Sequence, residues 1–136
     1  MYRWLKKRFP DSIPILSQDI IRDVITPGSK TDIQAIEKNR FPIFSRQSEQ
    51  FKFRYMRYWI VSGHERCNRS VPEELTIALD RIDEFLHSEA NQISYSMERG
   101  DILYINNNFI CHNRTGYIDH AEAEKKRTLV RTWINL

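Results

Sequence analysis

The chain has 136 residues, of which 40% are hydrophobic and 29% charged, a balance typical of one globular domain with a sizeable core. The formal net charge is only +3, which argues against a protein whose main partner is nucleic acid. No apolar run approaches the roughly 18 residues that a membrane-spanning helix needs, and the first residues lack the apolar segment of a signal peptide. The composition therefore predicts a cytoplasmic protein that does not enter a membrane.

The first forty residues are predicted to be partly helical. From Tyr2 to Phe9, apolar side chains recur at helical spacing and a proline follows, which predicts one amphipathic helix. Residues 12–39 are poorly patterned, because proline and glycine interrupt them. Within this stretch, residues 13–16 favour a short strand, and residues 33–38 favour either a helical turn or a mobile loop.

Two aromatic segments, residues 41–44 and 51–60, are predicted to form a hairpin. The second segment begins with strict alternation, which places Phe51 and Phe53 on one face of a strand and Lys52 on the other. Pro42 cannot donate a backbone hydrogen bond, so the first segment would have to be an edge strand.

The strongest helical signal follows residue 70. Ser70 and Glu73 have the spacing of a capping box, in which the serine side chain caps a helix and the glutamate reaches back. A regular apolar stripe comes next and predicts a helix over residues 72–88. The stripe consists of Leu75, Ala78, Leu79, Ile82, Phe85 and Leu86.

The last third of the chain is predicted to form strands separated by turns. Glu98 to Asp101 is a turn signal, and Asn106 should end a strand by satisfying backbone groups at the next turn. Together with the 12% aromatic content, these segments favour a mainly β domain of the α+β class with one well-defined helix inserted between strands. The strands are expected at residues 93–97, 102–106, 109–113 and 128–135.

Three side chains near the end of the chain are candidates for a functional site. His112 follows an apolar strand, and its neighbour Cys111 would point to the opposite face and into the core. Arg127 and Arg131 share the same strand parity, so both should face the same side, roughly 13 Å apart at about 3.3 Å per residue. The alternative is structural: a hydrogen-bonded histidine, and arginines that pair with surface carboxylates at a sheet rim.

The order of motifs in this region resembles a known family. An apolar strand after Gly100-Asp101 ends at Asn106-Asn107 and leads to His112-Asn113-Arg114-Thr115, and the strand Arg127-x-x-x-Arg131-x-Trp133 follows. Upstream, Phe53-Arg54-Tyr55-x-Arg57-Tyr58-Trp59-Ile60 and a helix come in matching order. This arrangement is similar to the iron(II)/2-oxoglutarate dioxygenases of the taurine dioxygenase and clavaminate synthase-like branch. The resemblance covers most of residues 40–136 and, more weakly, residues 1–40.

The resemblance implies a fold, two cofactors and three site residues. The fold would be part of a double-stranded β-helix, or jelly roll. By their places in the motifs, His112 would be an iron(II) ligand and Arg127 would bind the distal carboxylate of 2-oxoglutarate, for which a planar guanidinium is well shaped. Arg131 would meet an anionic group of a small-molecule substrate.

The family's second iron-binding motif, His-x-Asp/Glu, has no credible counterpart. His87-Ser88-Glu89 falls at the end of the expected helix, and His120-Ala121-Glu122 comes after His112. We therefore expect residues 1–136 to be the C-terminal portion of a taurine dioxygenase-like domain, with the N-terminal part of the fold absent. One neutral imidazole binds iron poorly, so the isolated chain should hold neither iron nor 2-oxoglutarate. It would oxidise a small molecule only if the missing motif were supplied in trans.

Two other functions remain open from the sequence. The chain could be a non-catalytic, degenerate β-rich module that binds proteins through exposed strand edges. In either case we expect a homo-oligomer or a partner chain that supplies the N-terminal half. Arginines and tyrosines alternating over residues 54–58 could also stack on nucleic-acid bases, but the low net charge argues against this.

Overall fold

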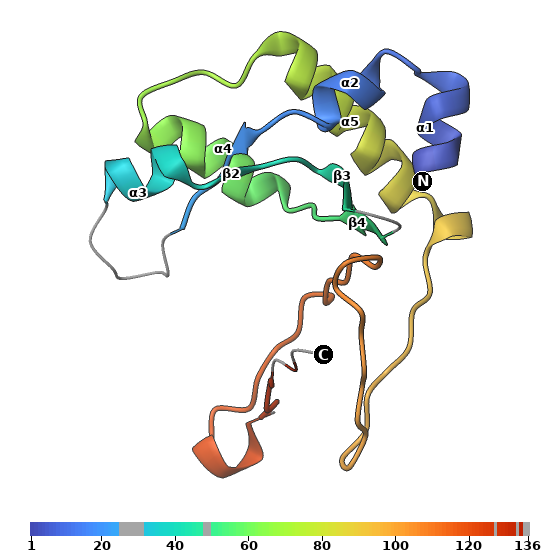
Figure 1. The fold of residues 1–136 in the computed structure, drawn as a ribbon. Helices are drawn as coiled ribbons and strands as arrows, with labels where there is room; N and C mark the ends of the chain where they lie inside the picture. The colour runs from blue at the N-terminus through green and yellow to red at the C-terminus, as the bar shows by residue number, and fades with distance from the viewer. Residues whose placement is uncertain (25–31, 48–49, 127, 133, 135–136) are drawn as a thin grey trace.

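The computed structural model describes residues 1–24, 32–47, 50–126, 128–132 and 134. They form a packed body that is followed by a long extended tail (Figure 1). The body ends with the short 3-10 helix η1, and η2 is the one regular element among the described residues of the tail. In chain order the elements are α1 (Tyr2–Arg8), α2 (Ser12–Leu16), β1 (Ile20–Ile21), α3 (Ile33–Lys38), β2 (Arg40–Phe41), β3 (Phe44–Gln47), β4 (Gln50–Phe53), α4 (Arg57–Arg66), α5 (Glu73–His87), η1 (Glu89–Asn91) and η2 (Ala123–Lys125).

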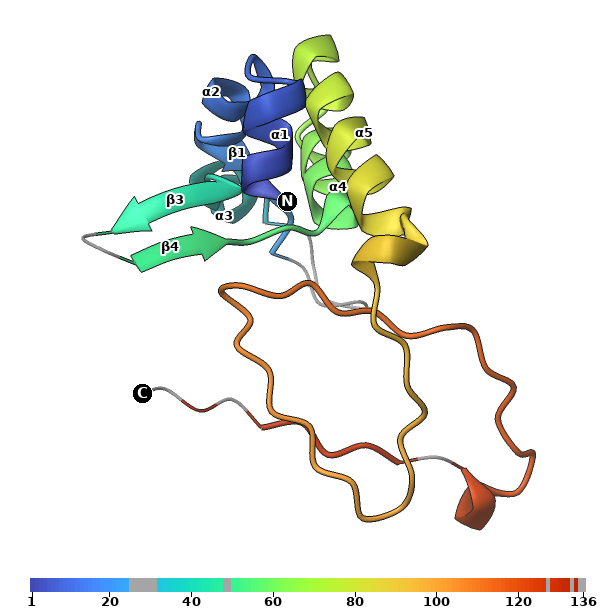
Figure 2. The same cartoon turned by 90° about the vertical axis from the view of Figure 1, so that its right-hand side faces the viewer.

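Helix α5 is the main support of the body. Its apolar stripe is buried at Leu75, Ala78, Leu79 and Ile82, and α2 packs against it (Figure 2). Leucine and isoleucine side chains contribute about 1.5–3 kcal/mol each when they are fully buried. The helix predicted over residues 72–88 is thus confirmed, as is the N-terminal helix, which is α1.

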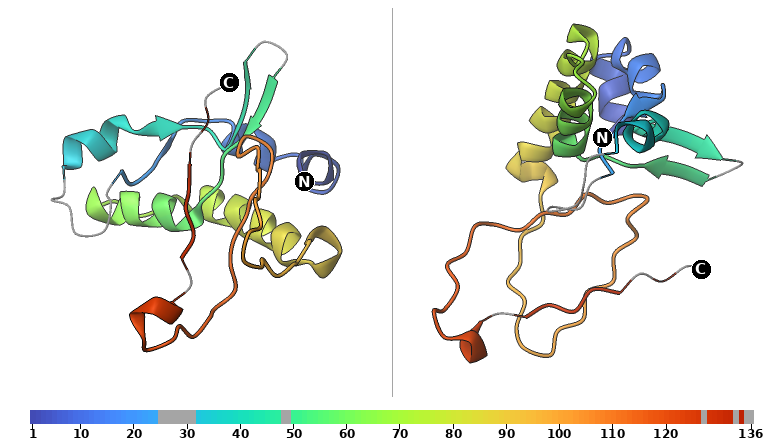
Figure 3. Two further views of the ribbon diagram at one scale, coloured as in Figure 1. Left: turned by 90° about the horizontal axis from the view of Figure 1, so that it is seen from below. Right: turned by 90° about the vertical axis from the view of Figure 1, so that its left-hand side faces the viewer.

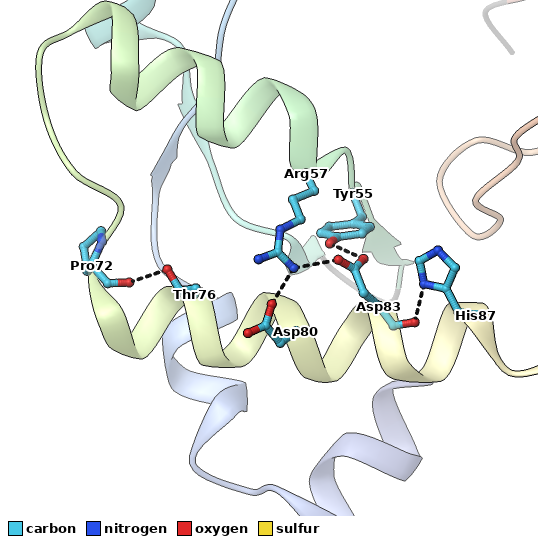
Figure 4. A network of polar contacts seen from close by, with 7 residues as sticks. All are labelled: Tyr55, Arg57, Pro72, Thr76, Asp80, Asp83 and His87. Carbon is cyan, nitrogen blue, oxygen red and sulfur yellow. Dashed lines mark hydrogen bonds and ion pairs between the residues drawn. The ribbon is translucent and has the colours of Figure 1, made fainter.

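The capping box predicted for α5 is wrong. The N-cap residue is Pro72, and no side chain caps the helix. Instead, the Thr76 amide and hydroxyl donate to the Pro72 carbonyl oxygen over 2.9 and 3.2 Å (Figure 4). Glu73 and Glu74 place negative charge at the positive end of the helix dipole, which stabilises this end without a cap.

Residues 13–16 are helical, so the strand predicted there is wrong. Pro14 lies in the first turn of α2, where the backbone N–H groups have no intrahelical partner, so a proline costs nothing. Leu16 is fully buried, and Ile13 and Ile15 pack against the same core. Residues 33–38, for which a helical turn or a loop was open, form helix α3.

A hairpin is present, but its first arm lies at residues 44–47 where 41–44 was predicted, and its second arm is shorter than expected. β3 pairs antiparallel with β4, with Phe44 opposite Phe53, while β2 pairs with β1 in a separate two-stranded sheet. Figure 3 shows the hairpin projecting from the helices. The strand expected to continue to residue 60 ends at Phe53, and helix α4 begins at Arg57. Arginines and tyrosines therefore do not alternate along one strand, and the row of side chains that could have stacked on nucleic-acid bases is not formed.

Aromatic rings hold the hairpin against α1. The Tyr2 ring meets Phe44 and Phe51 edge to face, with centroids 5.2 and 5.0 Å apart. Phe44 and Phe53 stack across the hairpin at 5.5 Å. Such pairs add about 0.5–1.5 kcal/mol each beyond the area that they bury. These contacts fix the position of β4, to which the tail attaches.

The tail after residue 91 contains no strand among its described residues. The turn at Glu98–Asp101 is confirmed, because the Asp101 amide donates to the Glu98 carbonyl oxygen over 3.2 Å. Among the described residues the predicted strands have no ladder partners, and apolar side chains in three of them, Ile93, Ile102 and Val130, are 93%, 76% and 92% exposed. The α+β class is confirmed, but the mainly β content and the partial β-helix are not formed in the described residues.

The solvent-exposed area of the chain is large for its mass. The chain exposes 11293 Å², whereas a compact monomer of 16.4 kDa would expose about 7,500 Å². The tail accounts for much of this excess, since most of the exposed large apolar residues lie in it. In the part of the chain that the structure describes, no helix has the length and apolar character needed to cross a membrane.

Candidate functional site around His112

The tail makes contact with the packed body at a point just before His112 in the sequence. The Phe53 amide in β4 donates to the Asn108 carbonyl oxygen over 2.7 Å, and Cys111 is half-buried against the core. The Asn106 side chain accepts from the Asn108 amide over 3.0 Å, which confirms the predicted contact at the turn, although no strand ends there. The core position predicted for Cys111 is also confirmed. His112 is exposed, but the residue before it is anchored.

A polar network lies beside this anchor. The Tyr55 hydroxyl donates to one Asp83 carboxylate oxygen over 2.6 Å, and Arg57 donates to the other over 2.7 Å (Figure 4). Arg57 also pairs with Asp80 at 2.6 Å. Burial and then the hydrogen bond to Asp83 raise the pKa of Tyr55, so its hydroxyl stays protonated and donating.

The Asp83 carboxylate should contribute more to stability than the neighbouring Asp80. Replacing Asp83 with alanine leaves the Tyr55 hydroxyl and Arg57 without their shared acceptor, and we expect a loss of about 1–2 kcal/mol in the free energy of unfolding. Asp80 is 60% exposed, so alanine there should cost less than about 1 kcal/mol. Urea unfolding of both variants tests this; equal losses would contradict the role given to Asp83.

The anchoring of Cys111 should suppress its reactivity. Burial, with a smaller effect of the Asp83 carboxylate, raises the pKa of the Cys111 thiol to about 11 from its ordinary value of 9.0. At about pH 8, a shift of this size lowers the reactive thiolate fraction by roughly 100-fold. In a Cys67→Ser background, iodoacetamide should therefore alkylate Cys111 far more slowly in the native protein than in urea. Equal rates in the two conditions would show that residues 106–111 are not docked.

The structure brings His112 and Arg131 together. An Arg131 guanidinium nitrogen lies 3.2 Å from His112 Nε2, and both side chains are exposed. The sequence predicts that Arg131 shares one side of a strand with Arg127, but nothing in the spacing of residues 112 and 131 indicates this contact. Arg127 lies outside the described residues.

The described residues do not by themselves fit an iron(II) ion. They contain no group of three or more His, Cys, Asp or Glu side chains placed to hold a metal. His87 lies in the last turn of α5, with Nδ1 2.8 Å from the Asp83 carbonyl oxygen, and His120 is exposed in the tail. His112 faces a guanidinium where iron would need a carboxylate or a second imidazole.

Comparison with known proteins identifies the family. Residues 1–133 match the family described as "Taurine catabolism dioxygenase TauD, TfdA family". The chain belongs to this family. The resemblance that the motifs predicted is therefore confirmed, and the match extends through the first forty residues, where the motif evidence was weak.

The chain is also similar to a curated protein, FR-33289 synthase from Streptomyces rubellomurinus. It is 31% identical to this chain over 100 residues, which represent 71% of the chain and 30% of the relative. The chain thus spans less than a third of the length of this relative.

Proposed function

We propose that this chain carries the C-terminal side of an iron(II)/2-oxoglutarate-dependent oxygenase that oxidises a small molecule. The observation that carries the proposal is the family match over residues 1–133, which includes the region of His112. Family membership supports dioxygenase-like chemistry, and enzymes of this kind use iron(II) and 2-oxoglutarate. The jelly-roll fold belongs to the same proposal, with the tail segments as its strands.

Three residues would contribute to the site. His112 would be one iron ligand, Arg127 would bind the distal carboxylate of 2-oxoglutarate, and Arg131 would bind an anionic group of the substrate. The charge-assisted, bidentate bonds of a guanidinium suit both arginine roles. The anchor at Asn108 and Cys111 would limit the movement of His112.

The remaining iron ligands, a His-x-Asp/Glu pair, would come from polypeptide outside these residues, supplied in trans. Two observations support the proposal that a second polypeptide completes the iron site. The exposed area exceeds that of a compact monomer by about half, and the predicted strands of the tail have no ladder partners among the described residues. A second segment that added strands would pair those backbones and cover their apolar side chains.

The exposed tail also favours a second candidate, a non-catalytic module that binds protein. Large exposed apolar surfaces mark interaction sites in soluble proteins. Under this alternative the tail would bind a partner or a second copy, but the complex would not convert 2-oxoglutarate. The two candidates therefore agree on assembly and differ on turnover.

Complementation distinguishes the two candidates. The DNA upstream of the Met1 codon, read in all frames, is the first source of a polypeptide with His-x-Asp/Glu. The chain and this polypeptide would be co-expressed, and succinate formation measured with iron(II), 2-oxoglutarate and ascorbate. We expect turnover that His112→Ala abolishes and that His120→Ala, the matched control, leaves intact. A stable complex that forms no succinate would favour the binding module.

A further inference from the structure

A cavity in the packed body lies between α2, the end of α4 and the start of α5. Its lining runs from Ile15 to Leu75 in the sequence, so it lies apart from the tail that carries His112. The volume is about 250 Å³. Pockets that hold drug-sized ligands have volumes of about 300–1,000 Å³, so this cavity suits a smaller molecule.

A buried hydrogen-bond acceptor belongs to the lining of this cavity. His64 is only 6% exposed, and its Nδ1 lies 2.8 Å from the Ile60 carbonyl oxygen. A carbonyl oxygen can only accept, so in the neutral imidazole the proton lies on Nδ1 and Nε2 presents its lone pair. Among the described residues no donor reaches Nε2, and the atom keeps contact with solvent. The group that fits here is therefore a hydrogen-bond donor.

Charged side chains of both signs line the rest of the cavity. Asp19 and Glu74 are exposed carboxylates that form no ion pair with any described residue. Arg69 pairs with Glu37 at 2.7 Å, which offsets its charge. Arg40 donates through Nε to the Glu37 carbonyl oxygen over 2.7 Å, and its two Nη groups have no acceptor in the described part of the chain. Two carboxylates and one guanidinium fork thus remain for a ligand.

We propose that this cavity binds a small zwitterion, a free α-amino acid. Its ammonium group would donate to Nε2 of His64 and lie near the carboxylates of Asp19 and Glu74. An ammonium has three donors and no acceptor, which matches these three acceptors. The ligand carboxylate would bind the Nη groups of Arg40. This binding site is independent of the proposed oxygenase activity.

Three matched probes test the proposal on the purified chain at about pH 8, where an imidazole is neutral. L-alanine carries both charges, ethylammonium lacks the carboxylate, and propionate lacks the ammonium. Long-range ¹H–¹⁵N NMR follows Nε2 of His64, whose signal is assigned by its loss in His64→Phe. We expect L-alanine to shift this signal saturably, and the other two, at matched ionic strength, to bind roughly 2- to 5-fold more weakly or not at all. Ethylammonium binding as tightly as L-alanine, or no saturable shift with L-alanine, would overturn the proposal.

Exposed variants identify the contributing residues without disturbing the core. Glu74→Gln keeps the shape of the side chain but removes its charge, and should weaken L-alanine binding roughly 2- to 5-fold. Glu73→Gln is the matched control, because Glu73 is also exposed in the first turn of α5 but does not line the cavity. Arg40→Gln should reduce the affinity for L-alanine to that for ethylammonium. If Glu73→Gln weakened binding as much as Glu74→Gln, the proposed site would be wrong.

Discussion

Replacing Gly63 with alanine should lower the free energy of unfolding by about 2–3 kcal/mol, although alanine is the better helix former by up to about 1 kcal/mol. Gly63 lies on the buried face of α4, where the chain after β1 crosses it closely. A Cβ atom at Gly63 would lie 2.7 Å from the Asp23 amide nitrogen and 2.9 Å from the Arg22 carbonyl carbon. These are backbone atoms and cannot move aside as a flexible side chain would.

Where the chain after β1 crosses α4, it also makes contacts that a shift of the backbone would disturb. The Asp23 amide donates to the Trp59 carbonyl oxygen over 2.8 Å, and the buried Asp23 carboxylate pairs with Arg66 at 2.9 Å. Gly116→Ala is the matched control, because a Cβ there meets no heavy atom within 4 Å. Urea unfolding should show a change within about 0.5 kcal/mol for the control. A Gly63→Ala variant as stable as the native chain would contradict the close approach of the chain after β1 to Gly63.

Replacing Arg127 with alanine in the complemented oxygenase should weaken apparent 2-oxoglutarate affinity by roughly 10- to 150-fold. The carboxylate would lose charge-assisted hydrogen bonds worth about 1.5–3 kcal/mol. Arg127→Lys should recover part of the loss, since it keeps the charge but lacks the planar fork. Titration of 2-oxoglutarate with succinate as the readout measures the effect.

The matched variant is Arg131→Ala, which should weaken binding of the prime substrate while sparing uncoupled 2-oxoglutarate decay. The two arginines therefore separate by which ligand each variant affects. If Arg127→Ala left the 2-oxoglutarate affinity unchanged and Arg131→Ala abolished it, the two roles would have to be exchanged.

Sequence periodicity predicted the elements that carry their own apolar face. Helix α5 was found within one residue at each end, because its stripe from Leu75 to Ile82 repeats at helical spacing and is buried. The strand predicted to residue 60 failed where the strict alternation ends, near Tyr55. Helix α4 has a weaker pattern, and its burial depends on the crossing at Gly63, which no local signal indicates.

The tail shows why strands are harder to predict than helices. A helix satisfies its backbone hydrogen bonds internally, whereas a strand needs a neighbour. The segments from Ile93 onward have strand-like sequences, but the described chain offers them no partner. The same limit applies to the site. Motif order pointed to His112, while the 3.2 Å contact with Arg131 depends on how the unpaired tail folds back.

We propose that this chain supplies one side of an oxygenase site and that another polypeptide supplies the rest. The most direct test measures succinate formation by the purified 136-residue chain, alone and with its complement, in one assay with iron(II), 2-oxoglutarate and ascorbate. We expect no turnover above background for the chain alone, and turnover that depends on His112 once the complement is added. Robust turnover by the chain alone would contradict it and would direct attention to His87 and Glu89 as ligands.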